Sequence, residues 1–255
     1  MGIFDIFKKK DTTPEAAASS PKKEGTSQGV SLSKKLDLRK EKVGISLAKK
    51  NVQSLVAEVF VCMDSSGSMS QLYKNGTVQE TLERLIPISL KFDDDGKIPF
   101  YTFSTDCAEQ PVLTLNNLEG YTKAFLSKAV GGGTKYSPPI NKIVKKAKNG
   151  ELSNPAFVIF ITDGENSDKA ETKKALVAAS EYDIYFQFVG IGNERFTFLR
   201  ELDNLTGRKF DNAGFIPIKD MARVSEEELY DKLIDEFVDI YKKNTFKSGK
   251  ISLVK

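Results

Sequence analysis

Uninterrupted apolar runs recur along the chain from about residue 55 onward and are separated by more polar stretches. Such runs predict buried strands, because a strand that is covered on both faces shows no polar alternation. The predicted strands are Leu55–Met63, Ile98–Phe103, Val112–Leu115, Ala156–Thr162, Ile184–Ile191 and a last strand that starts at Lys209–Asp211.

Between these runs, apolar residues recur every three or four positions, which is the spacing of one helix face. Val78, Leu82, Leu85 and Ile86 show this spacing. The predicted helices are Thr77–Leu90, Leu118–Ala129, Pro138–Lys148, Asp168–Ser180, Glu194–Leu205 and Ser225–Tyr241. Long apolar strands that alternate with helices predict an α/β fold with a doubly wound, mostly parallel central sheet that is flanked by helices on both faces.

The first residues differ from this pattern. Residues 1–10 place Ile and Phe before three lysines, which predicts at most a weak contact with an anionic membrane surface or a partner groove. Residues 11–29 have no apolar periodicity, so residues 1–29 are interpreted as a disordered basic leader and linker. The main domain is predicted over residues 53–245, with a C-terminal tail over 246–255.

A short alternating pattern occurs three times, twice in a predicted N-terminal extension over residues 30–52 and once at the end of the chain. The three copies are Val30–Lys34, Ile45–Lys49 and Ile251–Lys255. Their apolar and polar alternation suggests edge strands or short docking segments, and chance recurrence remains an alternative.

Composition narrows the chemistry. Residues 1–50 hold 12 Lys/Arg and 6 Asp/Glu (+6), whereas residues 51–255 hold 26 and 29 (−3), which argues against a nucleic-acid face on the domain. The absence of histidine removes His-based acid/base catalysis and His-ligated metals. Two cysteines cannot form a disulfide framework, and Cys62 is expected in the core. No apolar run is long enough to span a membrane. These observations together predict a cytoplasmic protein.

Three separated segments supply one set of oxygen ligands. Asp64 follows the first predicted strand, with Ser66 and Ser68 in the next loop; Thr134 follows a triple glycine; Asp163 ends another apolar run. Because parallel strands end at one edge of a sheet, the two carboxylates are expected to meet there. Two carboxylates and three hydroxyls suit a hard divalent cation, Mg²⁺ first, with Mn²⁺ or Ca²⁺ as alternatives.

This set resembles the metal-ion-dependent adhesion site (MIDAS) of von Willebrand factor type A (vWA) domains. This sequence fills all five positions of that pattern. The resemblance covers about residues 53–245. It implies a Rossmann-like fold with a six-stranded sheet and one antiparallel edge strand. It also implies that the hydroxyls contact the metal, with the aspartates often acting through water. Further segments resemble intracellular bacterial vWA domains of tellurium-resistance stress proteins and, around Thr134 and Asp163, those of copines.

The resulting hypothesis is a non-enzymatic module whose bound cation captures an Asp or Glu of a protein partner in a bacterial tellurium-resistance or stress-response system. One alternative is a metal-dependent hydrolase of phosphoryl or acyl groups, for which no general base is evident. Another is a scaffold that docks through its basic leader. Residues 92–96 are interpreted as a solvated turn, with a second cation site as the alternative, and Glu165 and Asn166 as candidate rim residues.

Overall fold

The computed structural model describes residues 31–243 and 246, except residues 54, 94, 129 and 165. The predictions for the leader, for the third copy of the short pattern and for the last nine residues therefore lie outside the described residues.

The core of the fold is one six-stranded sheet with the order β3-β2-β1-β4-β5-β6. Every neighbouring pair is parallel except β2 and β3, which are antiparallel. Its strands are β1 (Glu58–Asp64), β2 (Ile98–Phe103), β3 (Cys107–Leu113), β4 (Ala156–Thr162), β5 (Ile184–Ile191) and β6 (Ala213–Ile218). From β1, the chain adds strands first on one side (β2, β3) and then, beginning with β4, on the other. The pair β1 and β4 is therefore the topological switch point, where α/β sheets commonly bind ligands.

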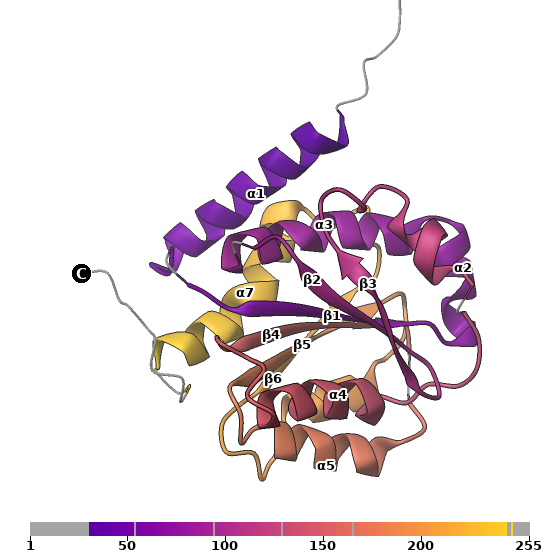
Figure 1. Cartoon of the computed structure of the whole chain (residues 1–255), viewed down its shortest axis with the longest axis vertical. Helices are drawn as coiled ribbons and strands as arrows, with labels where there is room; N and C mark the ends of the chain where they lie inside the picture. The colour runs from indigo at the N-terminus through magenta and orange to yellow at the C-terminus, as the bar shows by residue number, and fades with distance from the viewer. Residues whose placement is uncertain are drawn as a thin grey trace, which may run out of the picture. The chain divides into compact units, whose positions relative to one another are not determined.

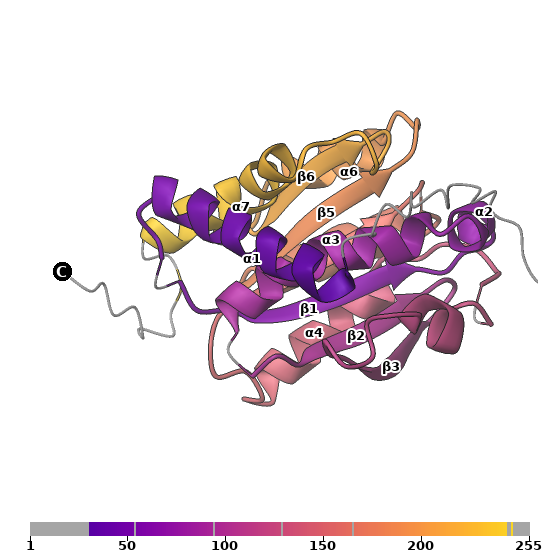
Figure 2. The ribbon, with the colours of Figure 1, turned by 90° about the horizontal axis from the view of Figure 1, so that it is seen from above.

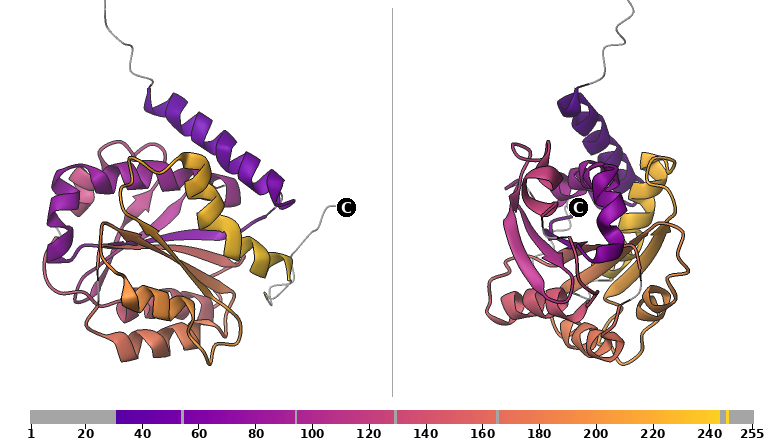
Figure 3. Two further views of the ribbon diagram at one scale, coloured as in Figure 1. Left: turned by 180° about the vertical axis from the view of Figure 1, so that it is seen from behind. Right: turned by 90° about the vertical axis from the view of Figure 1, so that its right-hand side faces the viewer.

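Helices cover both faces of the sheet (Figures 1 and 3). One layer holds α1 (Leu32–Lys49), the short α2 (Ser70–Lys74), α3 (Thr77–Phe92) and α7 (Glu226–Lys242). The other layer holds α4 (Ser137–Lys148), α5 (Lys169–Ala179) and α6 (Thr197–Asp203). A 3₁₀ turn, η1 (Gly67–Met69), and a π-helix, η2 (Thr122–Leu126), complete the described elements.

The two faces of each central strand belong to separate hydrophobic clusters. In β1, Val61 and Met63 point into the cluster beneath α1, α3 and α7, whereas Phe60 and Cys62 point into the cluster above α4, α5 and α6. This alternation is the two-residue period of a strand, and both sets are buried because both faces are covered. Cys62 is fully buried, as the sequence predicts.

The apolar runs locate the central strands well and the margins less well. The bounds of β2, β4 and β5 agree with the predicted ranges. The predicted strand at 112–115 is instead the end of β3, a half-exposed edge strand that begins at Cys107. The predicted helix at 118–129 is reduced to the π-helix η2, and the last strand starts at Ala213 rather than at 209–211. Residues 92–96 connect α3 to β2, with the side chains of Asp93 and Asp95 accepting backbone N–H bonds two residues on.

The prediction of edge strands in the N-terminal extension is wrong, because residues 32–49 form helix α1. The alternative, that the repeated pattern marks short docking segments, stays a prediction. Ser31 caps its first turn by accepting a hydrogen bond from the Lys34 backbone N–H. Leu36, Val43 and Leu47 lie seven and four residues apart, so they share one helix face, and all three are buried. A five-residue alternating pattern fits a helix as well as a strand when the longer spacing is ignored.

Helix α1 packs across α3 and α7 (Figure 2). Polar contacts reinforce this packing: Arg39 donates to the Glu226 carboxylate at 2.7 Å and to the Glu83 carbonyl at 3.1 Å, and Lys42 bonds Glu226 at 2.8 Å. Lys49 pairs with Glu227 in the same first turn of α7. The extension thus contributes to the same core as the rest of the domain.

We expect Leu47→Ala to destabilise the protein by about 2–5 kcal/mol, because it leaves a cavity where α1 meets the core. The measurement is the free energy of unfolding in urea. Leu38→Ala is the matched control: Leu38 is on the same helix but is 55% exposed, so its change should stay within about 0.5 kcal/mol. Equal effects of the two substitutions would contradict the packing of α1.

Candidate functional site

The candidate site lies at the carboxyl edge of the sheet, at the switch point. The register pairs Met63 of β1 with Ile161 of β4, so Asp64 is level with Thr162 and Asp163 is one residue further on. Parallel strands lie about 4.8 Å apart, so the two aspartates emerge side by side. The structure therefore brings together the carboxylates that the sequence places after separate strands.

Asp64 is fully buried, and its carboxylate is held by two donors. Its Oδ1 accepts the Ser66 backbone N–H at 2.7 Å, and its Oδ2 accepts the Thr162 hydroxyl at 2.6 Å. Its carbonyl oxygen accepts the Tyr73 hydroxyl at 2.8 Å, which ties α2 to the end of β1. A buried carboxylate needs such donors, because desolvation of an unpaired charge is costly.

Ser66, Ser68 and Asp163 form a chain of neighbouring oxygens. The Ser66 and Ser68 hydroxyls lie 3.1 Å apart, and the Ser68 hydroxyl donates to Asp163 Oδ1 at 2.8 Å. Ser65 faces the other way and donates its hydroxyl to the Phe103 carbonyl of β2. Alternate residues of the loop therefore serve either the site or the sheet.

Backbone hydrogen bonds fasten the Thr134 loop to the other two segments. Gly131 N–H donates to the Ser65 carbonyl at 2.8 Å, and Gly67 N–H donates to the Gly132 carbonyl at 3.2 Å. On the other side, the Ser167 backbone N–H and hydroxyl both donate to the Thr134 carbonyl. Gly131 and Gly132 have φ of 157° and 79°, and the second value is one that glycine adopts readily. Thr134 itself is half-buried within this frame.

Several residues that position the site were not singled out by sequence reasoning. Asp168 accepts the backbone N–H groups of Tyr136 and Ser137, both at 2.9 Å, and so anchors the start of α4 just after Thr134. The Tyr136 hydroxyl lies 3.2 Å from that of Thr162, linking this anchor to Asp64. A buried Tyr or Thr in an apolar context carries no sequence signal of such a role.

Asn166 does not line the rim as the sequence suggested. It is buried, and its side-chain amide donates to Asp168 at 2.7 Å and to the Thr172 hydroxyl at 2.9 Å. Its role is therefore to hold the loop after β4. Glu165 lies outside the described residues.

Burial shapes the acidity of the site. Desolvation raises the pKa of Asp64 to about 6, although the hydrogen bonds from Ser66 and Thr162 oppose the shift. Desolvation also raises the pKa of Asp163, against the hydrogen bond from Ser68. Without a cation, the site thus holds two carboxylates whose ionised forms are disfavoured.

The donor set fits a divalent cation. No group of three or more His, Cys, Asp or Glu that could hold a metal occurs among the described residues, so a metal site here needs other ligands, and the hydroxyl oxygens are available as such. The Ser66–Ser68–Asp163 chain brings two hydroxyls and a carboxylate to successive hydrogen-bond distances of 3.1 and 2.8 Å. These are the oxygen donors that a hard divalent cation prefers.

Comparison with known families decides the classification. Residues 56–248 match the model of the vWA-TerF-like family, described as the vWA domain found in the C terminus of TerF. The chain belongs to this family. Domains of the vWA type are generally protein-binding modules.

Individual relatives agree with this classification. The domain is similar to the uncharacterized protein YcbR of Bacillus subtilis, with 37% identity over 207 residues, which cover 79% of this chain and 84% of YcbR. It is also similar to protein BONZAI 1 of Arabidopsis thaliana, with 28% identity over 141 residues, which are 48% of this chain and 24% of that protein.

Solved structures support the fold alone. Proximal thread matrix protein 1 from the mussel byssus aligns with a TM-score of 0.55 and 17% identity over 72% of this chain and 48% of its own. Another structure of that protein, with a TM-score of 0.53 and 16% identity, is described as having a zinc-occupied MIDAS motif.

No helix in the described part of the chain is both long and apolar enough to cross a membrane.

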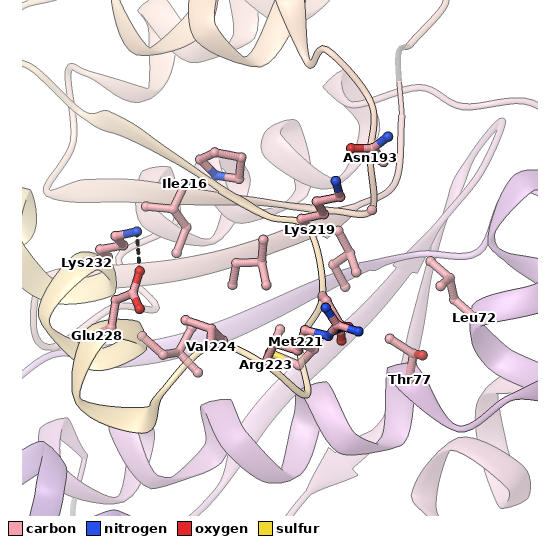
Figure 4. A pocket seen from close by; sticks show the side chains of 16 residues that line it. Leu72, Thr77, Asn193, Ile216, Lys219, Met221, Arg223, Val224, Glu228 and Lys232 are labelled. Carbon is pink, nitrogen blue, oxygen red and sulfur yellow. Dashed lines mark hydrogen bonds and ion pairs between the residues drawn. The ribbon is translucent and has the colours of Figure 1, made fainter.

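A groove of about 690 Å³ lies at the carboxyl ends of β5 and β6 (Figure 4). Residues from α2, from the ends of β5 and β6, and from the start of α7 line it. Its apolar residues include Leu72, Ile191, Ile218, Met221, Val224 and Leu229. Lys219 and Asn193, which also line the groove, directly follow Ile218 and Gly192, and the Gly192 backbone N–H donates to the Ile218 carbonyl at 3.0 Å.

The raised pKa of Asp64 predicts a pH-dependent stability in EDTA. The folded pKa of about 6 exceeds an unfolded value of about 3.9, so this stabilising contribution is complete below about pH 4. It is lost as the pH rises through 6, at a cost of about 3 kcal/mol. Asp64→Asn should remove this loss.

The measurement is the free energy of unfolding in urea at several pH values, in EDTA. Asp163→Asn should act in the same direction but less strongly, because Asp163 is only half-buried. If Asp64→Asn and the unmodified protein showed the same pH dependence, the assigned environment of Asp64 would be wrong.

Proposed function

We propose that this vWA domain is a metal-ion-dependent protein-binding module. Asp64, Ser66, Ser68, Thr134 and Asp163 hold a Mg²⁺ ion, through which the domain binds an Asp or Glu side chain of a protein partner. The TerF-like family membership supports a role in a bacterial tellurium-resistance or stress-response system.

The observation that carries the proposal is the oxygen chain from Ser66 through Ser68 to Asp163. It gathers two hydroxyls and a carboxylate at successive distances of 3.1 and 2.8 Å, and these are the oxygen ligands that a hard divalent cation prefers. Mg²⁺ is the ion expected first, because Mg²⁺ sites in proteins use one or two carboxylates and keep several waters.

The donor set also explains the preference for an acidic partner. Hydroxyl ligands are neutral, and the negative charge of the Asp64 carboxylate is already partly compensated by the hydrogen bonds that it accepts from Ser66 and Thr162. A dication in this site stays under-neutralised and would attract a further carboxylate. Mg²⁺ commonly keeps water ligands, and the partner's carboxylate would replace one of them.

A non-enzymatic role suits the same chemistry. The chain has no histidine, and the Tyr73 hydroxyl donates to the Asp64 carbonyl oxygen rather than to a base. Both aspartates belong to the metal set, which leaves neither for general-base catalysis.

Mg²⁺ should bind the isolated domain and mediate partner capture. Asp64→Ala should lose Mg²⁺ binding in calorimetry and should abolish the Mg²⁺-dependent, EDTA-sensitive pull-down of partners. Thr134→Ala should weaken Mg²⁺ binding by about 10- to 100-fold, because it removes a proposed ligand.

Thr105→Ala is the matched control. Thr105 is exposed next to the triple-glycine loop, with its methyl 3.5 Å from where a Cβ on Gly133 would lie, but it is outside the proposed ligand set. It should leave Mg²⁺ binding and capture unchanged. Identical capture by the unmodified protein and Asp64→Ala, with and without EDTA, would refute metal-mediated binding.

The hydrolase alternative gives an opposite expectation. With Mg²⁺ or Mn²⁺ present, we expect no turnover of p-nitrophenyl phosphate or p-nitrophenyl acetate above the level of Asp163→Ala. Clear turnover that Asp163→Ala abolishes would establish an enzymatic site instead.

A further inference from the structure

We propose that the groove beside the metal site receives apolar residues that neighbour the partner's metal-bound acidic residue. This inference rests on the proposed function and specifies the class of partner. The expected partner is an extended acidic and apolar segment of a protein.

The groove begins beside Asp163, and its residue Leu72 lies on the helix that Tyr73 ties to the end of β1. Thr162 pairs with Gly190 across β4 and β5, so Ile191 of the groove is level with Asp163, about 5 Å away along the sheet. Leu72 precedes Tyr73, whose hydroxyl bonds the Asp64 carbonyl at 2.8 Å. An extended chain advances about 3.3 Å per residue, so a segment anchored at the metal reaches the groove within a few residues.

The size and lining of the groove suit side chains rather than ions. Its volume of about 690 Å³ is within the range of about 300–1,000 Å³ that is usual for ligand pockets. Half of the sixteen lining residues are apolar, and two of these, Leu72 and Val224, remain half-buried rather than fully covered. Apolar surface that a partner can still bury is a source of binding energy.

Two of the three cationic side chains that line the groove are already paired with carboxylates. Arg223 pairs with Asp220 at 3.0 Å, and Lys232 pairs with Glu228 at 2.8 Å. Lys219 is exposed and has no ion-pair partner within the part of the chain that the structure describes. A second acidic side chain of the partner, beyond its apolar residues, would meet Lys219 and the neighbouring Asn193 amide (Figure 4).

The experiment uses the full chain and a random dodecapeptide library on phage, selected in Mg²⁺ and eluted with EDTA. We expect the eluted peptides to combine an Asp or Glu with apolar residues a few positions away and a second acidic residue beyond them. Synthetic copies should bind Leu72→Gln and Lys219→Glu about tenfold more weakly, while both variants bind Mg²⁺ with unchanged affinity.

Two variants outside the groove serve as matched controls. Leu115→Gln alters a leucine that is 49% exposed after the edge strand β3, and Lys148→Glu makes the same charge change at the end of α4. Both should bind the peptides like the unmodified protein.

The outcomes separate the two proposals. EDTA-eluted peptides that share an acidic residue but no apolar preference, or that bind the groove variants normally, would overturn the groove and leave metal-mediated binding intact. Peptides that bind equally in Mg²⁺ and EDTA, or a selection without any enriched peptide, would count against both.

Discussion

A buried carboxylate at the end of β1 is the constraint around which this edge of the molecule is organised. Asp64 has no exposed surface, so its oxygens depend on the Ser66 backbone and on the Thr162 hydroxyl. One donor comes from the loop that follows β1 and the other from the neighbouring strand β4. The position of Asp64 is therefore fixed only when these two segments are in register, which couples the site to the pairing of the central strands.

Main-chain hydrogen bonds also hold the three loops of the site together. Short backbone hydrogen bonds join the loop after β1 to the glycine-rich loop, and others join that loop to the segment after β4. Each contact uses main-chain groups that would otherwise need water. The loops that carry the candidate ligands are consequently held by a frame of main-chain contacts, which fixes where the ligand side chains emerge. The Asp168 carboxylate completes this frame, and although burial opposes it, the donors from Ser137 and Tyr136 lower its pKa.

Sequence reasoning recovered what depends on local pattern and on strand ends. The bounds of β2, β4 and β5 and the convergence of Asp64 and Asp163 follow from apolar runs and from parallel pairing. The five-residue alternation conceals helix α1, whose buried residues become visible only at the wider spacing of seven and four residues. Thr162, Tyr136 and the groove could not have been found in this way, since their roles depend on which elements pack together.

The burial of Asp64 also connects the proposed metal binding with the stability of the fold. Selection for stability alone would favour an apolar or neutral residue at position 64, because burial disfavours the ionised form of the Asp64 carboxyl group. A cation that binds the folded domain stabilises it in proportion to the logarithm of its concentration relative to Kd. Binding of the proposed cation would therefore offset the destabilising effect of the buried, ionised Asp64 carboxylate. A site of this kind is tolerated within a large hydrophobic core, where two helical layers on one sheet supply the remaining stability.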